Sequence, residues 1–240
     1  MQSSGSHDNT IKIWDAGLGT CLATLPGQAN DVWSVDWHPD GARLASASSD
    51  KLVKIWDTSK GTCVATLSGH TKYVRCVQWH RDGIRLASGS DDNTVNIWDT
   101  NQNTCLKALS GHTSRVHDVQ WHPVDIRMAS CSNDGTIKIW DTVKATCLAT
   151  LSGHGASVDS VHWHPDGTRL LIVMLNTATN MGNLIWRHRS ITDKNHLIVF
   201  AVFVQNIECR RCLGMPPYAL GPNGFINEVM KIEILEMLEF

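Results

Sequence analysis

The first two thirds of this chain repeat with a period of 42 residues. Residues 70–111 match residues 112–153 at 24 of 42 positions, without an insertion or deletion. A repeat of this length predicts stacked units, each of which forms one supersecondary structure and buries its core against its neighbours. The period is marked by the pairs Trp14-Asp15, Trp56-Asp57, Trp98-Asp99 and Trp140-Asp141.

Each full repeat predicts a four-stranded antiparallel unit, so the fold class is all-β. Segments of alternating and β-branched residues are separated by short clusters of Asp, Asn and Gly, which favour turns. In one repeat the predicted strands are 74–79, 85–90, 94–98 and 104–109.

The repeat has clear limits along the chain. Its phase fails after Leu170, and only the last half of a repeat, 9–25, precedes the first full one. We therefore predict a repeat domain over 1–171 and a divergent tail over 172–240. The apolar run 197–204 predicts a strand, because a bilayer requires about 20 apolar residues. Helical spacing of apolar residues predicts an amphipathic helix over 225–240.

Composition limits the possible partners and locations. Apolar residues make up 42% of the chain and charged residues 18%, which is typical of a globular protein. The net charge of -2 gives no field that attracts phosphate backbones, so nucleic acid is not the expected partner. The first 15 residues lack the apolar segment of a secretory signal. We expect a cytoplasmic or nuclear protein with no membrane partner.

Cysteine and histidine ladders also follow the repeat. Equivalent cysteines on separate sheets would lie too far apart for disulfides, so we interpret them as small buried apolar residues. The histidines are interpreted as turn residues, because equivalent turns on separate sheets would not converge on one metal. The ladders are Cys21, Cys63, Cys105 and Cys147, and His38, His80, His122 and His164.

Each of two full repeats contains His, Ser, Asp and Trp at fixed offsets. A Ser-His-Asp set raises the possibility of hydrolysis, but a catalytic triad is built once per active site and not once per repeat. We therefore interpret the set as a structural tetrad, in which Asp accepts from His, His contacts Ser, and Ser contacts the Trp ring nitrogen. The two sets are His70, Ser88, Asp92 and Trp98, and His112, Ser130, Asp134 and Trp140.

These motifs resemble the WD40-repeat β-propeller family over about residues 1–171. The resemblance implies a β-propeller of four-stranded blades, and the chain has material for about four of them. The sequence departs from the family pattern at three places: Gln28 replaces the expected His, the first partial repeat has no His for Ser4, Asp8 and Trp14, and the repeat that starts at His154 never acquires its Ser, Asp and Trp.

The partial repeats at the two ends allow two arrangements of the blades. The first half repeat and the last one are able to pair into a four-bladed ring, or the blades form an open arc. We favour an incomplete propeller, because wedge angles suited to a larger ring do not close readily at four blades. An open arc exposes edge strands that invite pairing with another chain.

The resemblance implies a non-catalytic scaffold for protein–protein interaction within a multiprotein complex. No cofactor and no small-molecule substrate are expected. Two alternatives remain at this point: a truncated fragment of a larger propeller without its own function, and a metal or redox role of Cys209-x-x-Cys212. Loop residues that vary between repeats, and that include typical interface anchors, are the predicted partner-binding residues. They are Trp33, Tyr73, Arg75, Asp91, Arg115, His117 and Asn133.

Overall fold

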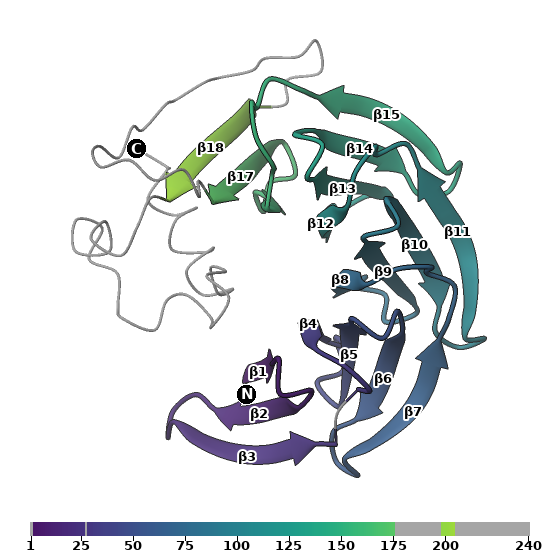
Figure 1. The fold of residues 1–240 in the computed structure, drawn as a ribbon, viewed down its shortest axis with the longest axis vertical. Coiled ribbons are helices and arrows are strands. Elements are labelled where there is room, and N and C mark those ends of the chain that lie inside the picture. The colour runs from purple at the N-terminus through teal and green to yellow at the C-terminus, as the bar shows by residue number, and fades with distance from the viewer. Residues whose placement is uncertain (1, 27, 176–197, 205–240) are drawn as a thin grey trace.

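The computed structural model describes residues 2–26, 28–175 and 198–204. These residues form strands and loops, and the described part of the chain contains no helix. Five sheets follow one another along the chain, as Figure 1 shows. Three of them have four strands each, as the repeat predicted, and the all-β fold class is confirmed.

We number the sheets as blades one to five in chain order. Blade one contains β1 (Gln2–Gly5), β2 (Ile11–Asp15) and β3 (Thr20–Leu25). Blade two contains β4 (Val32–Trp37), β5 (Arg43–Ser48), β6 (Val53–Asp57) and β7 (Thr62–Leu67). Blade three contains β8 (Val74–Trp79), β9 (Arg85–Ser90), β10 (Thr94–Asp99) and β11 (Thr104–Ser110). Blade four contains β12 (Val116–Trp121), β13 (Arg127–Ser132), β14 (Ile137–Asp141) and β15 (Thr146–Leu151). Blade five contains β16 (Ser160–Trp163), β17 (Arg169–Leu175) and β18 (Ile198–Val204).

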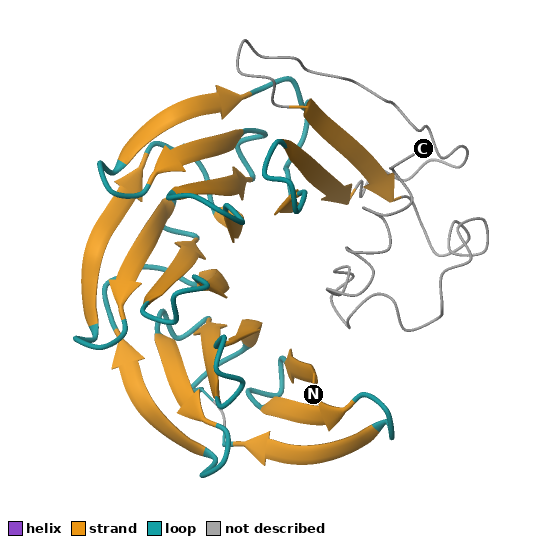
Figure 2. Cartoon of the chain, turned by 180° about the vertical axis from the view of Figure 1, so that it is seen from behind, coloured by secondary structure: helices purple, strands orange, loops and turns teal. Residues whose placement is uncertain are grey.

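The blades stand side by side in an open arc. The first strand of each full blade, which we term the inner strand, lies toward the middle of the arc, and the fourth, outer strand lies at its rim (Figures 1 and 2). Neighbouring strands in these blades pair antiparallel in sequence order. The described blades do not close into a ring, so the prediction of an incomplete propeller is confirmed and the four-bladed ring is not formed by them.

Blade one differs from its prediction. The sequence predicted two strands between residues 9 and 25, but β1 pairs with β2 and adds a third. The pairing places Ser4 opposite Lys12 and Gly5 opposite Ile11. The short polar segment of β1 lacks the alternation that identifies a strand. Its place beside β2 corresponds to that of the second strand in each full blade, so blade one lacks an inner strand among the described residues.

The hydrophobic clusters of the described residues join neighbouring blades. In one cluster Ile55 of blade two packs with Val74, Trp79 and Trp98 of blade three, and all of these side chains are buried. The same arrangement joins blades three and four, where Ile97 packs with Val119 and Trp140. Because each blade covers one face of the next, the stability of the array comes from contacts between nearest neighbours.

The prediction that the repeated cysteines are buried is wrong. Cys21, Cys63, Cys105 and Cys147 are exposed, because they lie on outer strands and no blade packs outside the rim. Each thiol instead contacts the carbonyl two residues further along, as Cys63 Sγ does with Ala65 O at 3.2 Å. Two other cysteines, Cys76 and Cys131, are buried. Burial raises the pKa of both thiols well above the ordinary value.

The predicted tail lies mostly outside the described residues. β18 falls within the apolar run 197–204 and pairs in parallel with β17. The predicted helix 225–240 and the pair Cys209-x-x-Cys212 are both outside the part of the chain that the structure describes. No helix in the described part is long and apolar enough to cross a membrane.

Candidate functional site

The array has two faces with different loops. One face, which we term the upper face, carries the loops that enter the inner strands and the turns between second and third strands. There the backbone N–H of Asp91 donates to the carbonyl of Tyr73 at 2.9 Å. The opposite, lower face carries the remaining turns, where the N–H of Thr100 donates to the carbonyl of Ile84 at 3.0 Å.

The His, Ser, Asp and Trp side chains of blade four form a linear hydrogen-bond network. Trp140 Nε1 donates to Ser130 Oγ at 2.8 Å, and Ser130 Oγ lies 2.8 Å from His112 Nε2. His112 Nδ1 lies 2.9 Å from Asp134 Oδ2. Ser130 has no exposed surface, so it is not presented to a substrate. Blade three has the same network, with His70 contacting Asp92 at 2.9 Å and Ser88 at 2.8 Å.

Burial determines the protonation of this network. Burial is the largest cause that lowers the pKa of His112, which keeps the ring neutral. Burial also acts to raise the pKa of Asp134, but hydrogen bonds from Thr136, Thr113 and His112 outweigh it and hold that pKa well below the ordinary value. A neutral ring with its proton on Nδ1 donates to the carboxylate and accepts from Ser130. The network therefore ties the upper turn of the blade to its own sheet.

The glycine before each histidine makes room for the tryptophan ring. Gly111 adopts a φ of 152°, and a Cβ added there would lie 3.3 Å from the ring of Trp140. In blade three, a Cβ on Gly69 would lie 3.1 Å from the ring of Trp98. The Gly-His pair is thus explained by the close approach of the loop to the ring.

Blade two has an altered network. Gln28 replaces histidine, and its Nε2 donates to Ser46 Oγ, which also accepts from Trp56 Nε1 at 2.8 Å. The Oε1 atom of Gln28 is buried and has no partner. Asp50, which would accept from a histidine, receives the backbone N–H of Ala29 and Leu52 instead. Blade two forms its four strands, but with one acceptor unsatisfied.

Replacing Gln28 with histidine is expected to stabilise the protein by about 1–3 kcal/mol, the cost of one unsatisfied buried polar group. The imidazole would reach both Ser46 and Asp50, as His70 reaches Ser88 and Asp92. Urea denaturation of Gln28→His and the unchanged protein measures the difference. The control makes the same Gln28→His change in an Asp50→Ala background and compares it with Asp50→Ala alone, because without the acceptor the histidine should give no gain. An equal gain in that background would contradict the explanation.

Four of the predicted partner-binding residues meet on the upper face of blades two and three. The Arg75 guanidinium lies over the Trp33 ring at 4.2 Å and over the Tyr73 ring at 5.9 Å. Two nitrogens of Arg75 donate to the two carboxylate oxygens of Asp91, each at 2.8 Å. The Trp33 ring nitrogen donates to Ser49 Oγ at 2.6 Å. This fixed stack leaves Tyr73 44% exposed at the surface.

The other three residues lie on blade four. The backbone N–H of Asn133 donates to the carbonyl of Arg115 at 3.0 Å, and Arg115 is exposed. His117 is half-buried, and its Nε2 atom is buried without a hydrogen-bond partner. Burial lowers the pKa of His117, although the negative charge of Asp159 acts to raise it.

The lower face contains joints between blades that the sequence analysis missed. The ring of His38 packs edge-on against Trp79 of the next blade at 4.5 Å, and its Nε2 contacts the carbonyl of Gly83 at 2.8 Å. His122 repeats this arrangement with Trp163, at 4.6 Å, and Gly167 O, at 2.9 Å. The histidine ladder does lie in turns, as predicted, but His38, His80 and His122 also contact the next blade. No group of three metal-ligating side chains occurs among the described residues.

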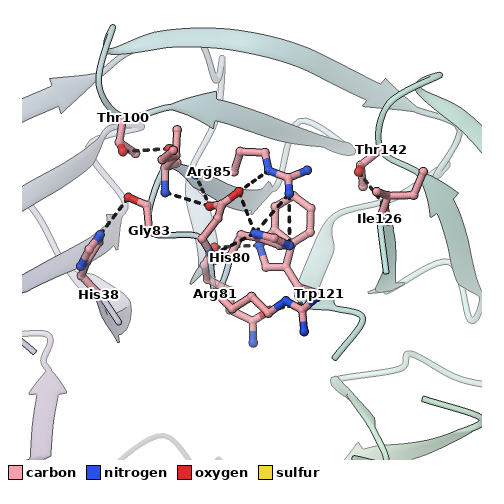
Figure 3. A network of polar contacts seen from close by, with 12 residues as sticks. His38, His80, Arg81, Gly83, Arg85, Thr100, Trp121, Ile126 and Thr142 are labelled. Atoms are coloured by element: carbon pink, nitrogen blue, oxygen red, sulfur yellow. Dashed lines mark hydrogen bonds and ion pairs between the residues drawn. The ribbon is translucent and has the colours of Figure 1, made fainter. Parts of the chain in front are cut away.

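The joint between blades three and four is different. Figure 3 shows Arg81, His80 and Trp121 of this joint, and the contact of His38 with Gly83 in the joint before it. Position 125, which corresponds to Gly83 and Gly167, is Asp. In that joint Arg81 donates to the carbonyls of Pro123, at 2.6 Å, and Val124, at 2.9 Å. His80 keeps its edge-on contact with Trp121, at 4.8 Å. The sequence signal for this substitution was the pairing of an unusual Arg at 81 with the missing glycine one repeat later.

Comparisons with known proteins agree with this architecture. The family model described as "WD domain, G-beta repeat" matches residues 2–15, 19–57, 61–99, 103–141 and 145–173, which is more than half of the chain. A lissencephaly-1 homolog from Branchiostoma floridae is 55% identical over 38 residues, which are 16% of this chain and 9% of that protein.

Two further relatives give similar short matches. Nuclear distribution protein nudF 2 from Aspergillus clavatus is 50% identical over 46 residues, which are 19% of this chain and 10% of that protein. A lissencephaly-1 homolog from Dictyostelium discoideum is 50% identical over 44 residues, which are 18% of this chain and 10% of that protein. The alignments therefore span about a tenth of the length of these relatives, or about one repeat. Because the matched repeats cover most of the described residues and reproduce the blade structure, the chain belongs to the WD40-repeat family, a family of protein-interaction scaffolds.

Proposed function

We propose that the chain binds a protein partner on its upper face, with the Trp33, Arg75 and Tyr73 stack as the anchor. The observation that carries the proposal is this stack, in which the Arg75 guanidinium lies over the Trp33 and Tyr73 rings and is held by Asp91. Interface hot spots are enriched in Trp, Tyr and Arg, and rigid aromatic groups lose little entropy on binding. Non-catalytic interaction is also the general role of WD40 repeats.

Variation among the repeats supports the choice of this face. The lower joints reuse histidine in each turn, and the tetrads reuse the same four residue types in blades three and four. The upper positions instead change from one blade to the next: the inner-strand position is Trp33, Arg75, His117 and Asp159 in turn. Framework positions must stay alike to fold alike, whereas positions outside the framework are able to differ and to distinguish partners.

The charges of the upper face favour a partner segment with a carboxylate beside an apolar side chain. Arg75 is already paired with Asp91, but Arg115 and Lys72 are both exposed on this face. A carboxylate placed near them would gain electrostatic attraction, which contributes mainly to specificity and association rate. Tyr73 supplies the apolar contact surface. The cytoplasmic or nuclear location, the absence of catalysis and the membership of a multiprotein complex stay predictions.

A peptide-display selection tests the proposed face. Random linear peptides are selected on the unchanged protein and then compared on the double variant Tyr73→Ala with Arg75→Ala. We expect enriched peptides to carry Asp or Glu beside an apolar residue, and to bind the double variant at least about tenfold more weakly, since a hot-spot residue contributes 2 kcal/mol or more.

The matched control is a double variant on the opposite face, Val124→Ala with Val143→Ala. Both valines are exposed, at 61% and 59%, so their truncation leaves the core intact. Selected peptides should bind this control as they bind the unchanged protein. Peptides that bind the lower-face control more weakly, but bind the upper-face variant normally, would show that the binding site lies on the lower face. That result would contradict the proposal.

A further inference from the structure

We propose that blade one binds an extended segment of a partner polypeptide, which becomes its inner strand. Among the described residues β1 has one hydrogen-bonded neighbour, β2, so its other edge faces the middle of the arc (Figure 1). An edge strand with a free side is a template for strand addition. This inference does not rest on the upper-face proposal, because it uses a different surface.

The second strand is less buried in blade one than in the full blades. In blades two, three and four, the serine of the tetrad on the second strand, Ser46, Ser88 or Ser130, has an exposure of 0%. The equivalent Ser4 is half-buried, although it accepts from Trp14 Nε1 at 3.0 Å as its counterparts do. The local network of blade one is therefore formed, and what it lacks is the cover that an inner strand gives in the full blades.

The inner strand of blade two gives a second, independent indication. Val77 and Trp79 of β8 are buried, each with an exposure of 5%, because β4 lies beside them. The equivalent residues of β4, Val35 and Trp37, are only half-buried. One added strand on β1 would cover both β1 and this side of β4.

An unpaired donor lies at the same place. The ring nitrogen of Trp121 donates to the carbonyl of Gln78 on the preceding inner strand at 3.2 Å, and Trp163 donates to Gln120 in the same way at 3.2 Å. Trp37 Nε1 is buried and has no partner. Trp79 Nε1 is also unpaired, so the donor alone does not identify the site. Together with the exposure of β4, it indicates where a carbonyl of the added strand would lie.

The full blades define the register of the added strand. β8 places Val74 opposite Ser90, Val77 opposite Ser88 and Trp79 opposite Leu86. By the 42-residue period, the added segment would place Val, Val and Trp opposite Ser6, Ser4 and Gln2. A histidine four residues before the first Val would then reach Ser4 and Asp8, as His70 reaches Ser88 and Asp92.

Contacts between inner strands define the remaining positions. The backbone N–H of Trp79 donates to Asp36 at 2.7 Å, and that of Trp121 donates to Gln78 at 2.7 Å. The residue before the segment's Trp should therefore be Asp or Gln, to accept from the N–H of Trp37. A histidine after that Trp would pack on Trp37 and contact Gly41, as His38 packs on Trp79 and contacts Gly83. The partner chemistry is an extended segment of the form His-x-x-x-Val-x-x-Val-(Asp or Gln)-Trp-His.

A synthetic peptide with the sequence of residues 111–122 provides the probe, because it has this form and contains no cysteine. Fluorescence anisotropy of the labelled peptide with the full chain should show saturable binding with one peptide per chain. Hydrogen exchange should show new protection at residues 2–6 and 32–37, and unchanged exchange in blades three and four. An extended peptide that pairs elsewhere would protect other strands.

Paired variants test the register. His112→Ala in the peptide and Asp8→Ala in the protein should each weaken binding about tenfold, the effect of one hydrogen bond to a charged group. The two changes together should weaken binding little more than either alone, because both remove the same contact. Asp8 lies in an exposed turn, so its truncation leaves the core unchanged. Thr20→Ala, at an exposed position of the outer strand of the same blade, is the matched control and should not change binding.

Three results would overturn the proposal. One is the absence of saturable binding at millimolar peptide, and another is protection confined to residues outside 2–6 and 32–37. The third is a dimer, detected by light scattering, in which these two segments are protected without peptide, because a second copy of the chain would then occupy the edge. The upper-face variant Tyr73→Ala with Arg75→Ala should bind the peptide normally, which separates this result from that of the display selection.

Discussion

Trp140→Ala is expected to lower the free energy of unfolding by about 3–5 kcal/mol, the range for truncation of a large aromatic side chain in a core. Trp140 is 1% exposed and packs in the cluster between blades three and four. Its removal creates a cavity and also takes away the donor to Ser130, which is fully buried. Urea denaturation followed by circular dichroism measures the loss.

Trp14→Ala is the matched comparison, because Trp14 has the same place in blade one. It donates to Ser4 but is only half-buried, and no histidine of the described segments completes its network. We expect its truncation to cost clearly less than that of Trp140. Equal losses at the two positions would show that burial between complete blades is not what makes this tryptophan important.

Acidification is expected to produce the second large effect, in two stages. The first stage depends on His112, whose pKa is lowered, chiefly by burial. The unfolded chain takes up a proton at this histidine near pH 6.5, before the folded chain does, so stability should fall as the pH drops below about 6.5. Burial also lowers the pKa of His80 and His117, which add to this stage.

The second stage depends on aspartates of the same networks. Although burial acts to raise the pKa of Asp92 and Asp134, their hydrogen bonds hold it well below the ordinary value. Their contribution to stability is therefore present above about pH 4 and is lost as the pH falls further, because the unfolded carboxylates protonate first. Asp40, whose pKa is lowered to about 2 by hydrogen bonds that outweigh burial, adds a smaller exposed contribution.

His112→Gln separates the two stages. Gln28 shows that glutamine is able to occupy this position in a blade that forms all four strands. In the variant, stability should depend less on pH between 7 and 5, while the loss below pH 4 remains. Urea midpoints measured at pH 7.5, 6, 5 and 3.5 provide the comparison. An unchanged slope between pH 7 and 5 would mean that His112 is not the titrating group.

The sequence predicted the strands of the full blades closely. In blade three the predicted 85–90 agrees with β9, and the predicted 94–98 differs from β10 by one residue. This accuracy has a physical cause, because turn residues recur at fixed offsets and each strand is bounded by them. β1 was missed because its four polar and small residues become a strand through pairing with β2, which is a property of the sheet and not of the segment.

Contacts between blades were the least predictable part. The exposure of the cysteine ladder follows from its position at the rim, which the period alone does not specify. The joint of Arg81 with the carbonyl of Val124 links residues 43 apart in sequence through a backbone atom, and backbone acceptors leave no residue pattern. The predicted upper-face residues were chosen because they vary, and the contact of Arg75 with Trp33 and Asp91 became visible only in three dimensions.

Near-identical neighbours carry a risk during folding, because a segment of one repeat is able to dock in the place of another, and misassembly is a known failure of repeat proteins. The joint made by Arg81 works against this error. Its guanidinium fits a turn that has no glycine at position 125, whereas the histidine joints fit turns that have one, at Gly83 and Gly167. Blades three and four therefore make a contact that no other adjacent pair in the described chain makes. This difference between the joints favours one order of the blades over others.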